Sequence, residues 1–382
     1  MRKTTTTGLL RYVIVMAGVF ISLFSVVELA GWVLVPDRYK NPPAVTADAW
    51  ISSDALIGKD TLWLKEFVDE FCRSYTAHWA SYLYFRREPF AGKHINVDSS
   101  GLRITPQRDM SRDPRRHTLT AMLLGGSTMW GTGARDSATI PAALARLILS
   151  PPDRPAMRIV NMGESGYVNT QSLLALELEL RRGNVPDLVI FYDGINDVFS
   201  AYQNNEAGLP QNEYNRATEF NLLQDGGRMR ELGVHDFWKR TVTAGAVASL
   251  RNLITATPPP LIRRDNVAED VIRIYRGNLE ILDALSRHFG FHYGVYLQPV
   301  VFTKRDPSPY EQAQIAKMEY VRPFFLEVYR RAAADSSLQA NPHFHNLSSI
   351  LDGVGPVYLD FCHITERGNQ IVAQRLYEDL FK

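Results

Sequence analysis

The chain has 382 residues, of which 45% are apolar, and its formal net charge at pH 7 is +1. The apolar content is enough to fill a sizeable core and excludes wholesale disorder. A net charge so close to zero gives no reason to expect a nucleic-acid partner. The two cysteines, Cys72 and Cys362, are too few for a disulfide framework, although one bridge between them is possible outside the cytosol.

The first apolar stretch lies at the N-terminus. Residues 12–27 carry no charge, and the apolar character continues past Glu28 as far as Pro36. In a helix, Tyr12 and Trp32 are separated by about 30 Å, the thickness of one bilayer core. Their side chains would then be interfacial aromatics. Basic residues before the stretch predict a cytoplasmic N-terminus, with everything after Pro36 outside the cytoplasm.

A cleaved signal peptide and a buried core helix are the alternatives to a membrane anchor. The stretch is long, and Glu28-Leu29-Ala30 is a poor small-x-small cleavage site, which disfavours a signal peptide. The terminal position disfavours a core helix. An uncleaved anchor within residues 1–36 is therefore the favoured interpretation.

Residues 37–93 are predicted to form an extracytoplasmic N-terminal extension. Aromatic side chains follow one another, partly at helical spacing, at Trp63, Phe67, Phe71, Tyr75, Trp79, Tyr82, Tyr84 and Phe85. Such a stripe is more typical of a packing face than of a ligand site. Residues 96–105 predict a turn and a short strand that enters the main domain, residues 94–382. The arginines at 103, 108, 112, 115 and 116 suggest a basic, solvated connector.

From residue 118 onward, strand and helix patterns alternate. The predicted strands are 119–124, 157–161, 187–192, 291–297 and 357–359, and the predicted helices are 140–149, 170–182, 267–288, 310–334 and 366–381. Alternation of this kind implies a parallel sheet covered by helices on both faces. Right-handed crossovers then bring every strand-to-helix loop to one edge of that sheet.

Residues 199–266 interrupt the alternation. The first half of this insertion is polar, and the second half has a helical pattern before Pro258-Pro259-Pro260. Because the insertion leaves the loop after the 187–192 strand, we expect it to overhang the edge of the sheet that carries the strand-to-helix loops. A substrate-facing cap and a peripheral decoration both fit this position.

Residues suited to acyl transfer follow the predicted strands. Ser127 comes after an apolar run and two glycines, Gly166 lies in a turn, Asn196 follows the third strand, and Asp360 and His363 follow the last. Acyl transfer needs a nucleophile, a base, a group that orients the base, and donors for the oxyanion. Ser127 would attack, His363 would carry the proton, and Asp360 would hold the imidazole tautomer. The backbone N–H groups of Ser127 and Gly166 and the side-chain amide of Asn196 would donate to the oxyanion.

These segments resemble the four blocks of the SGNH, or GDSL-type, hydrolase family. The serine, glycine, asparagine and histidine of that family match Ser127, Gly166, Asn196 and His363. The resemblance covers about residues 94–382 and implies a flavodoxin-like, three-layer α/β/α sandwich with a mainly parallel sheet. It also implies an esterase, lipase, carbohydrate deacetylase or O-acyltransferase. The usual Gly-Asp-Ser is Gly-Gly-Ser here, so the acidic neighbour of the serine is missing.

Other reactive residues have weaker support. Neither Ser165 nor Ser127 has a glycine two positions later, so the Gly-x-Ser-x-Gly elbow of α/β-hydrolases does not apply, and Ser165 is interpreted as a turn residue. Cys362 is interpreted as a small buried residue. Asp193 and Asp197 are alternatives to Asp360 as the orienting acid, but Asp360 is nearer to the histidine.

His343 and His345 flank Phe344 on a possible strand and would face the same side. A metal pair is conceivable there, but no third ligand has matching spacing. We therefore expect neither a metal nor an organic cofactor.

The sequence thus predicts a single-pass membrane protein with a periplasmic or extracellular serine esterase domain. Its substrates would be O-acyl esters, O-acetyl esters first among them, on envelope or exopolysaccharide carbohydrate. The alternatives are an O-acyltransferase that uses the same residues, and a non-catalytic envelope scaffold or glycan-binding module.

Overall fold

The computed structural model describes residues 6–34, 53, 56, 62–107, 118–149, 157–223 and 265–381. The chain divides into two compact units. One consists of Met1–Ala44 and Asn215–Pro258, and the other of Val45–Tyr214 and Pro259–Lys382. Residues 224–264, most of the predicted insertion, lie outside the described residues, so the substrate-facing cap stays a prediction.

The first unit contains α1 (Thr6–Leu34), which covers the predicted apolar stretch. Its segment Arg11–Ala30 has a mean hydropathy of 2.4 and is not buried inside the protein. A helix that is apolar on all sides is stable when it is surrounded by other apolar groups, as in a bilayer. By length and composition, α1 can therefore cross a membrane, and a signal sequence has the same properties.

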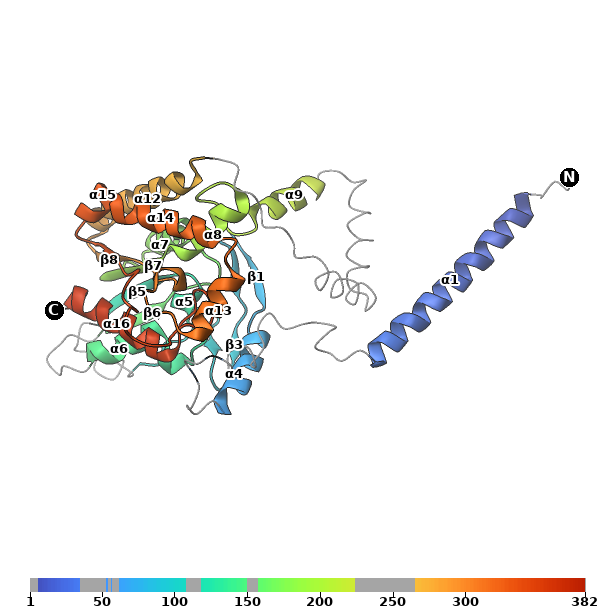
Figure 1. The fold of residues 1–382 in the computed structure, drawn as a ribbon, viewed down its shortest axis with the longest axis horizontal. Helices are drawn as coiled ribbons and strands as arrows, with labels where there is room; N and C mark the ends of the chain where they lie inside the picture. The colour runs from blue at the N-terminus through green and yellow to red at the C-terminus, as the bar shows by residue number, and fades with distance from the viewer. Residues whose placement is uncertain are drawn as a thin grey trace. The chain divides into compact units, whose positions relative to one another are not determined.

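The second unit is built on a five-stranded parallel sheet (Figure 1). Its strands are β5 (Leu119–Gly125), β6 (Met157–Asn161), β7 (Leu188–Asp193), β8 (His292–Leu297) and β9 (Phe344–Asn346), paired in the order β6-β5-β7-β8-β9. Counted along the chain, this order is 2-1-3-4-5, the flavodoxin-like doubly wound arrangement. Ligands of such sheets bind outside the carboxyl ends of the strands, at the point where the strand order reverses. Here that point lies between β5 and β7.

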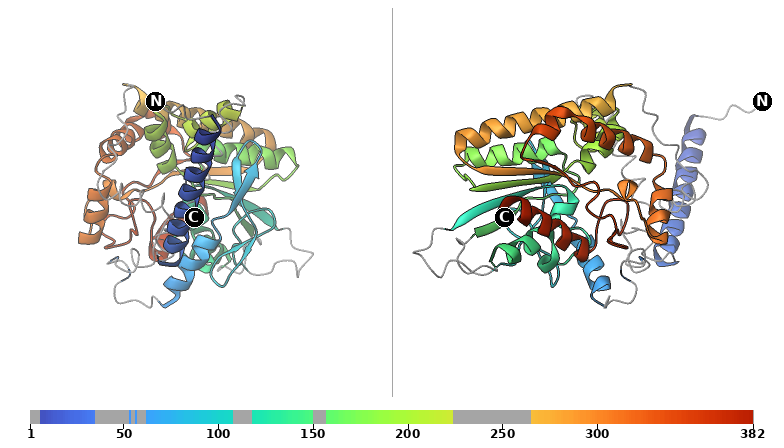
Figure 2. Two further views of the ribbon diagram at one scale, coloured as in Figure 1. Left: turned by 90° about the vertical axis from the view of Figure 1, so that its right-hand side faces the viewer. Right: turned by 60° about the vertical axis from the view of Figure 1, so that its left-hand side comes forward.

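Helices cover both faces of the sheet (Figures 1 and 2). One layer consists of α7 (Asn169–Arg181), α8 (Ile195–Asn204), α12 (Val267–Phe289) and α14 (Arg322–Ala334), and the other contains α6 (Ile140–Leu149) and α16 (Glu366–Phe381). Every residue of β7 is buried, as expected for a strand covered on both sides. The predicted three-layer α/β/α fold is thus confirmed.

Two predicted elements are wrong. The fifth strand is Phe344–Asn346, whereas 357–359 lies in a loop that is buried and carries the isolated bridge Tyr358–Ile364. A short buried loop and a short buried strand have the same apolar pattern. The predicted helix 310–334 is two helices, α13 (Pro309–Lys317) and α14. A proline in the first turn of α14 is tolerated because no hydrogen bond is lost there.

The described residues of the N-terminal extension belong to the same compact unit as the sheet. They form α4 (Leu62–Arg73), the hairpin of β1 (Ala77–Ala80) and β2 (Tyr84–Arg87), and β3 (Phe90–Ala91), which pairs with β4 (Asn96–Val97) at the start of the main domain. Arg103 then bridges Asn161 at the edge of β6, and its side chain is buried, so the predicted solvated connector is wrong at this residue. The arginines at 108, 112, 115 and 116 lie outside the described residues.

The aromatic stripe of the extension divides into two parts. Phe67 and Phe71 of α4 are buried, as predicted for a packing face. Tyr75, Trp79 and Tyr82 are more than half exposed, but the Tyr75 ring lies 5.8 Å from that of Phe71 and the Trp79 ring 5.6 Å from that of Tyr84. The packing interpretation is therefore wrong for Tyr82 and holds only in part for Tyr75 and Trp79.

Candidate active site

Ser127 is the first residue of the short helix α5 (Ser127–Trp130), directly after β5 and its glycines. The first N–H groups of a helix have no acceptor within it, so the Ser127 N–H is available to a ligand. The preceding residue must be small, since a Cβ on Gly126 would lie 2.2 Å from Nδ2 of Asn196. The side-chain amide of Asn196 therefore packs against the backbone that leads into Ser127.

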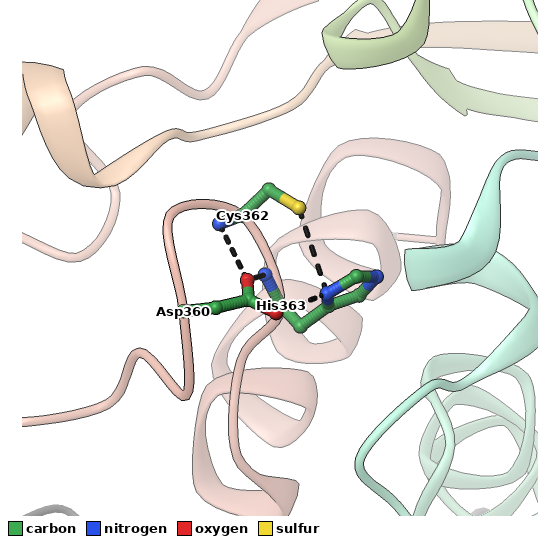
Figure 3. Close-up of side chains that lie close together, drawn as sticks. All are labelled: Asp360, Cys362 and His363. Atoms are coloured by element: carbon green, nitrogen blue, oxygen red, sulfur yellow. Dashed lines mark hydrogen bonds and ion pairs between the residues drawn. The ribbon is translucent and has the colours of Figure 1, made fainter. Parts of the chain in front are cut away.

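The structure brings Ser127, His363 and Asp360 into one hydrogen-bonded line. His363 Nε2 lies 2.8 Å from Ser127 Oγ, and His363 Nδ1 lies 2.7 Å from Asp360 Oδ2. Figure 3 shows the carboxylate and the imidazole side by side on their loop. Ser127 and His363 are 236 residues apart in sequence, and this contact depends on the sheet bringing their loops to one edge.

The other oxygen of Asp360 fixes the loop itself. Asp360 Oδ1 accepts hydrogen bonds from the backbone N–H of Cys362, at 2.9 Å, and of His363, at 2.7 Å. Burial by itself would raise the pKa of Asp360, but the charge and hydrogen bonds of His363 and the N–H donors outweigh it, so the pKa lies below its ordinary value. Asp360 is therefore a carboxylate at neutral pH and can hold His363 in the tautomer that carries its proton on Nδ1.

The two other predicted donors lie beside this line. Gly166 has φ +79°, a left-handed conformation that favours glycine. Asn196, the second residue of α8, donates from Nδ2 to the carbonyl of Tyr167, the residue after Gly166, at 2.8 Å. An amide nitrogen carries two hydrogens, so the second remains available to a ligand. Ser127, Gly166 and Asn196 thus converge on one edge of the sheet.

One residue of this cluster was not predicted. Gln211 donates from Nε2 to Asn196 Oδ1 at 3.1 Å, and its Oε1 would lie 3.2 Å from a Cβ on Gly166. The Asn196 amide is therefore held at both ends, with its nitrogen on Tyr167 and its oxygen on Gln211. Gln211 lies in the polar insertion, where neither periodicity nor a motif distinguishes it from its neighbours.

A buried ion pair supports the loop of Asp360 and His363. Glu311 accepts from the backbone N–H groups of Val357 and Tyr358, at 2.9 and 3.0 Å, and pairs with Lys304 at 2.8 Å. Burial would raise the pKa of Glu311, but the hydrogen bond from Lys304 and those from the backbone lower it below its ordinary value. The loop is therefore fastened to a charged carboxylate that is itself fixed in the interior.

A second group of buried charges supports the α5 turn. The guanidinium carbons of Arg87 and Arg103 lie 4.1 and 4.3 Å from the ring centre of Trp130, three residues after Ser127. Arg103 also donates to the Trp130 and Gly131 carbonyls, at 3.2 and 2.7 Å. Each arginine has a carboxylate partner, Glu164 for Arg87 and Asp136 for Arg103. The nucleophile turn thus packs against one arginine of the N-terminal extension, Arg87, and one of the first segment of the main domain, Arg103.

The alternative orienting acids have other partners. Asp197 accepts from the backbone N–H of Asn169, at 3.0 and 3.2 Å, and Asp193 accepts from the Asn169 side chain and from Tyr275. Burial raises the pKa of both, that of Asp197 to about 6. Among these acids, Asp360 is the one hydrogen-bonded to His363.

The remaining candidates are structural in this arrangement. Ser165 is buried in its turn, where Oγ accepts from Arg87 at 2.6 Å. Cys362 is buried and unpaired, and so is not bridged to Cys72. Its Sγ lies 3.6 Å from His363 Nδ1, so Asp360, Cys362 and His363 bring three potential metal-ligand atoms within 4.8 Å (Figure 3).

The histidine pair near β9 packs on tyrosines. His343 lies 4.2 Å from the ring of Tyr293, and His345 is stacked at 4.6 Å on Tyr296. His345 also lies 3.4 Å from a carboxylate oxygen of Asp379.

The sequence matches no protein-family model, and no curated protein is significantly similar to it. Solved structures with a similar arrangement include the acetyl xylan esterase AlAXEase, at 10% identity and a TM-score of 0.37, with 69% of this chain and 100% of that chain covered. Axe2, an acetylxylan esterase from Geobacillus stearothermophilus, has 16% identity and a TM-score of 0.34 over 69% and 94% of the chains. TesA has 16% identity and a TM-score of 0.35 over 69% and 98%. At this level of similarity, the chemistry of the present chain has to be argued from its own residues.

Proposed function

We propose that the chain is a serine esterase of the SGNH type, with Ser127, His363 and Asp360 as its catalytic residues. The observation that carries the proposal is the continuous hydrogen-bonded line from the Asp360 carboxylate through the imidazole to Ser127 Oγ, with steps of 2.7 and 2.8 Å. These distances are those over which a base can take the proton of a nucleophile. Three N–H donors beside the serine complete the requirements for acyl transfer.

The reaction would proceed through an acyl-serine. Ser127 Oγ attacks the ester carbonyl while its proton passes to His363 Nε2, and the tetrahedral oxyanion accepts hydrogen bonds from the Ser127 and Gly166 N–H groups and from Asn196 Nδ2. The C–O bond to the alcohol then breaks, and His363 returns the proton to the leaving oxygen. A water molecule, deprotonated by the same imidazole, attacks the acyl-serine and releases the carboxylic acid. Asp360 stays ionised throughout and stabilises the imidazolium.

The location of the domain follows from α1. If α1 is an uncleaved anchor, the basic residues before it place the N-terminus in the cytoplasm and the α/β unit on the other side of the membrane. A domain held there meets the acylated carbohydrates of the envelope or of exopolysaccharide. We therefore propose O-acyl groups on carbohydrate, acetyl above all, as the substrate. The acetyl xylan esterases among the similar structures act on esters of this kind.

The proposal is tested by labelling and turnover. The full-length protein in detergent is treated with a fluorophosphonate probe and assayed with p-nitrophenyl acetate. We expect labelling at Ser127 and measurable turnover, both lost in Ser127→Ala, with a fall in kcat of up to about six orders of magnitude. Labelling at another serine, or turnover that survives in folded Ser127→Ala, would refute the assignment.

A further inference from the structure

Three aromatic side chains are exposed on the segment that runs from the end of α4 through the β1–β2 hairpin. Tyr75, Trp79 and Tyr82 are 55%, 68% and 69% exposed. They continue the aromatic stripe of α4, of which Phe67 and Phe71 are buried. Contiguous exposed apolar surface is typical of interaction sites, and three large exposed rings within eight residues make this segment a candidate. We call these three rings the aromatic shelf.

The turn of the hairpin has an unusual backbone conformation that leaves the Tyr82 ring exposed. Leu83, between the two strands, is buried, and its carbonyl accepts from Gln171 Nε2 at 3.0 Å. Its two neighbours, Tyr82 and Tyr84, have φ +68° and +71°. Bulky residues rarely adopt this left-handed conformation, and such strain is found most often where a side chain has to be presented for function. The turn is drawn inward by Leu83 while the Tyr82 ring faces solvent.

The hairpin is attached to the loop that carries Gly166. The contacts are Tyr167 Oη to the Phe85 carbonyl at 2.5 Å, Arg86 Nη1 to the Met162 carbonyl at 3.3 Å, Arg87 Nε to Glu164 at 3.2 Å and Tyr84 Oη to Glu213 at 2.9 Å. The last of these joins the hairpin to the turn of Gln211, which holds Asn196. The hairpin (β1 in Figure 1, blue in Figure 2) therefore borders the proposed oxyanion site.

From this arrangement we infer that the aromatic shelf is a glycan subsite, which binds sugar rings next to the residue whose acyl group enters the Ser127 site. Pyranose rings present flat faces of C–H groups that pack on aromatic rings, while tyrosine hydroxyls and the indole N–H can bond the hydroxyls at the ring edges. The inference rests on the proposed esterase function and specifies its substrate as a carbohydrate polymer.

A membrane surface is the other environment in which tryptophan and tyrosine are enriched. The surroundings of the shelf favour the glycan. The arginines of its hairpin are buried, and its exposed charged residues are a histidine and an acid that pair with each other, His78 and Glu88 at 3.3 Å, whereas binding to anionic lipids needs exposed basic residues. The hydrogen bonds between the hairpin and the Gly166 loop also bring the segment of the shelf close to the proposed oxyanion site.

The test compares a small ester with polymers on the full-length protein in detergent. The shelf variant combines Trp79→Ala with Tyr82→Asn, because asparagine tolerates the left-handed backbone at 82. The substrates are p-nitrophenyl acetate, O-acetylated xylan as an uncharged polymer and O-acetylated alginate as an acidic one. Tyr320→Ala is the control, since Tyr320 is an exposed tyrosine between α13 and α14, away from the hairpin.

We expect the shelf variant to keep kcat/KM for p-nitrophenyl acetate within about twofold of wild type. For at least one polymer, its KM should rise about 10- to 100-fold, as the loss of two stacking contacts predicts. The control Tyr320→Ala should leave kcat and KM for all three substrates unchanged. If the shelf variant has an unchanged KM for both polymers, the glycan subsite is wrong. The same holds if the wild-type protein cleaves p-nitrophenyl acetate but neither polymer. In both cases the proposed esterase function still stands. A wild-type protein inactive on all three substrates overturns the proposed function, and the subsite with it.

Fluorescence quenching tests the alternative that the shelf inserts into a membrane. Wild type and Trp79→Phe are reconstituted in vesicles that contain brominated phosphatidylcholine, which quenches indole fluorescence in the bilayer. Equal fractional quenching in the two proteins supports a shelf outside the lipid. A marked reduction in quenching in Trp79→Phe would place the indole in the bilayer and overturn the inference.

Discussion

The Asn196 side chain provides the sharpest test of the oxyanion site. In Asn196→Ala, the oxyanion loses one of three donors, and removal of one such donor typically lowers kcat by about 10²–10³, equivalent to about 2.7–4 kcal/mol of transition-state stabilisation. KM should change little, because the donor acts on charge that develops after the substrate has bound.

The same substitution also has a cost in stability that can be worked out from the contacts. It removes the hydrogen bond to the Tyr167 carbonyl and the one from Gln211, each worth about 0.5–1.5 kcal/mol. A loss of about 1–3 kcal/mol is smaller than the stability of a typical domain, about 5–15 kcal/mol, so the variant should remain folded. The fall in kcat is therefore not a result of unfolding.

The assay measures kcat and KM for p-nitrophenyl acetate beside thermal unfolding. Asn369→Ala is a matched control, because Asn369 also donates from its amide to a backbone carbonyl, that of Ala138 at 3.0 Å, but lies on α16. We expect it to lower the unfolding temperature while kcat stays within a few-fold of wild type. A folded Asn196→Ala protein with kcat reduced less than tenfold would refute the oxyanion role of the amide.

Three further predictions concern the supporting residues. Gln211→Ala should lower kcat about 2- to 10-fold at unchanged KM by releasing the Asn196 amide, and an unaltered kcat would contradict this role. Burial raises the pKa of Asp197 to about 6, so the contribution of Asp197 to the unfolding free energy should fall by about 1–3 kcal/mol as the pH rises from 4 past 6. In urea titrations, the difference in unfolding free energy between wild type and Asp197→Asn should fall by this amount over that range, and a difference that does not change with pH would exclude this contribution of Asp197. Glu311→Gln leaves Lys304 buried without its charge partner, so it should lower the free energy of unfolding in urea by about 3–5 kcal/mol. A decrease below about 1 kcal/mol would disprove this prediction.

The parallel sheet and the meeting of the reactive residues were predictable from the sequence for the same physical reason. Strands buried on both faces are apolar runs, and right-handed crossovers put the residues after those runs at one edge. Ser127 follows such a strand, whereas the apolar run before His363, residues 357–359, is a buried loop, so the prediction for His363 rested on an incorrect strand. The fifth strand was assigned to 357–359, and the one around Phe344 was noted only as a possible strand, because a three-residue strand and a buried loop bury the same kind of side chain.

The supporting residues were not predictable, because their roles depend on contacts between segments far apart in sequence. Glu311 looks like an ordinary residue at the start of a helix, and only the fold shows it buried beneath Val357 and Tyr358. Gln211 lies in a polar stretch without any pattern. Arg103 looked like part of a basic surface run, whereas its guanidinium is buried against Trp130.

The N-terminal extension supports the proposed active site, a role that the resemblance to the SGNH family did not predict. A separate apolar cluster joins Phe67 and Phe71 of α4 to Trp130, on the helix of Ser127, and to Leu359, directly before Asp360. One helix of the extension thus packs against both segments that carry the proposed triad. Contacts in a close-packed cluster of this kind do not relax fully when one member is removed, so a cavity at Phe71 would loosen the two segments together. The extension is therefore a structural part of the proposed active site, because it fixes the separation of the nucleophile from its base.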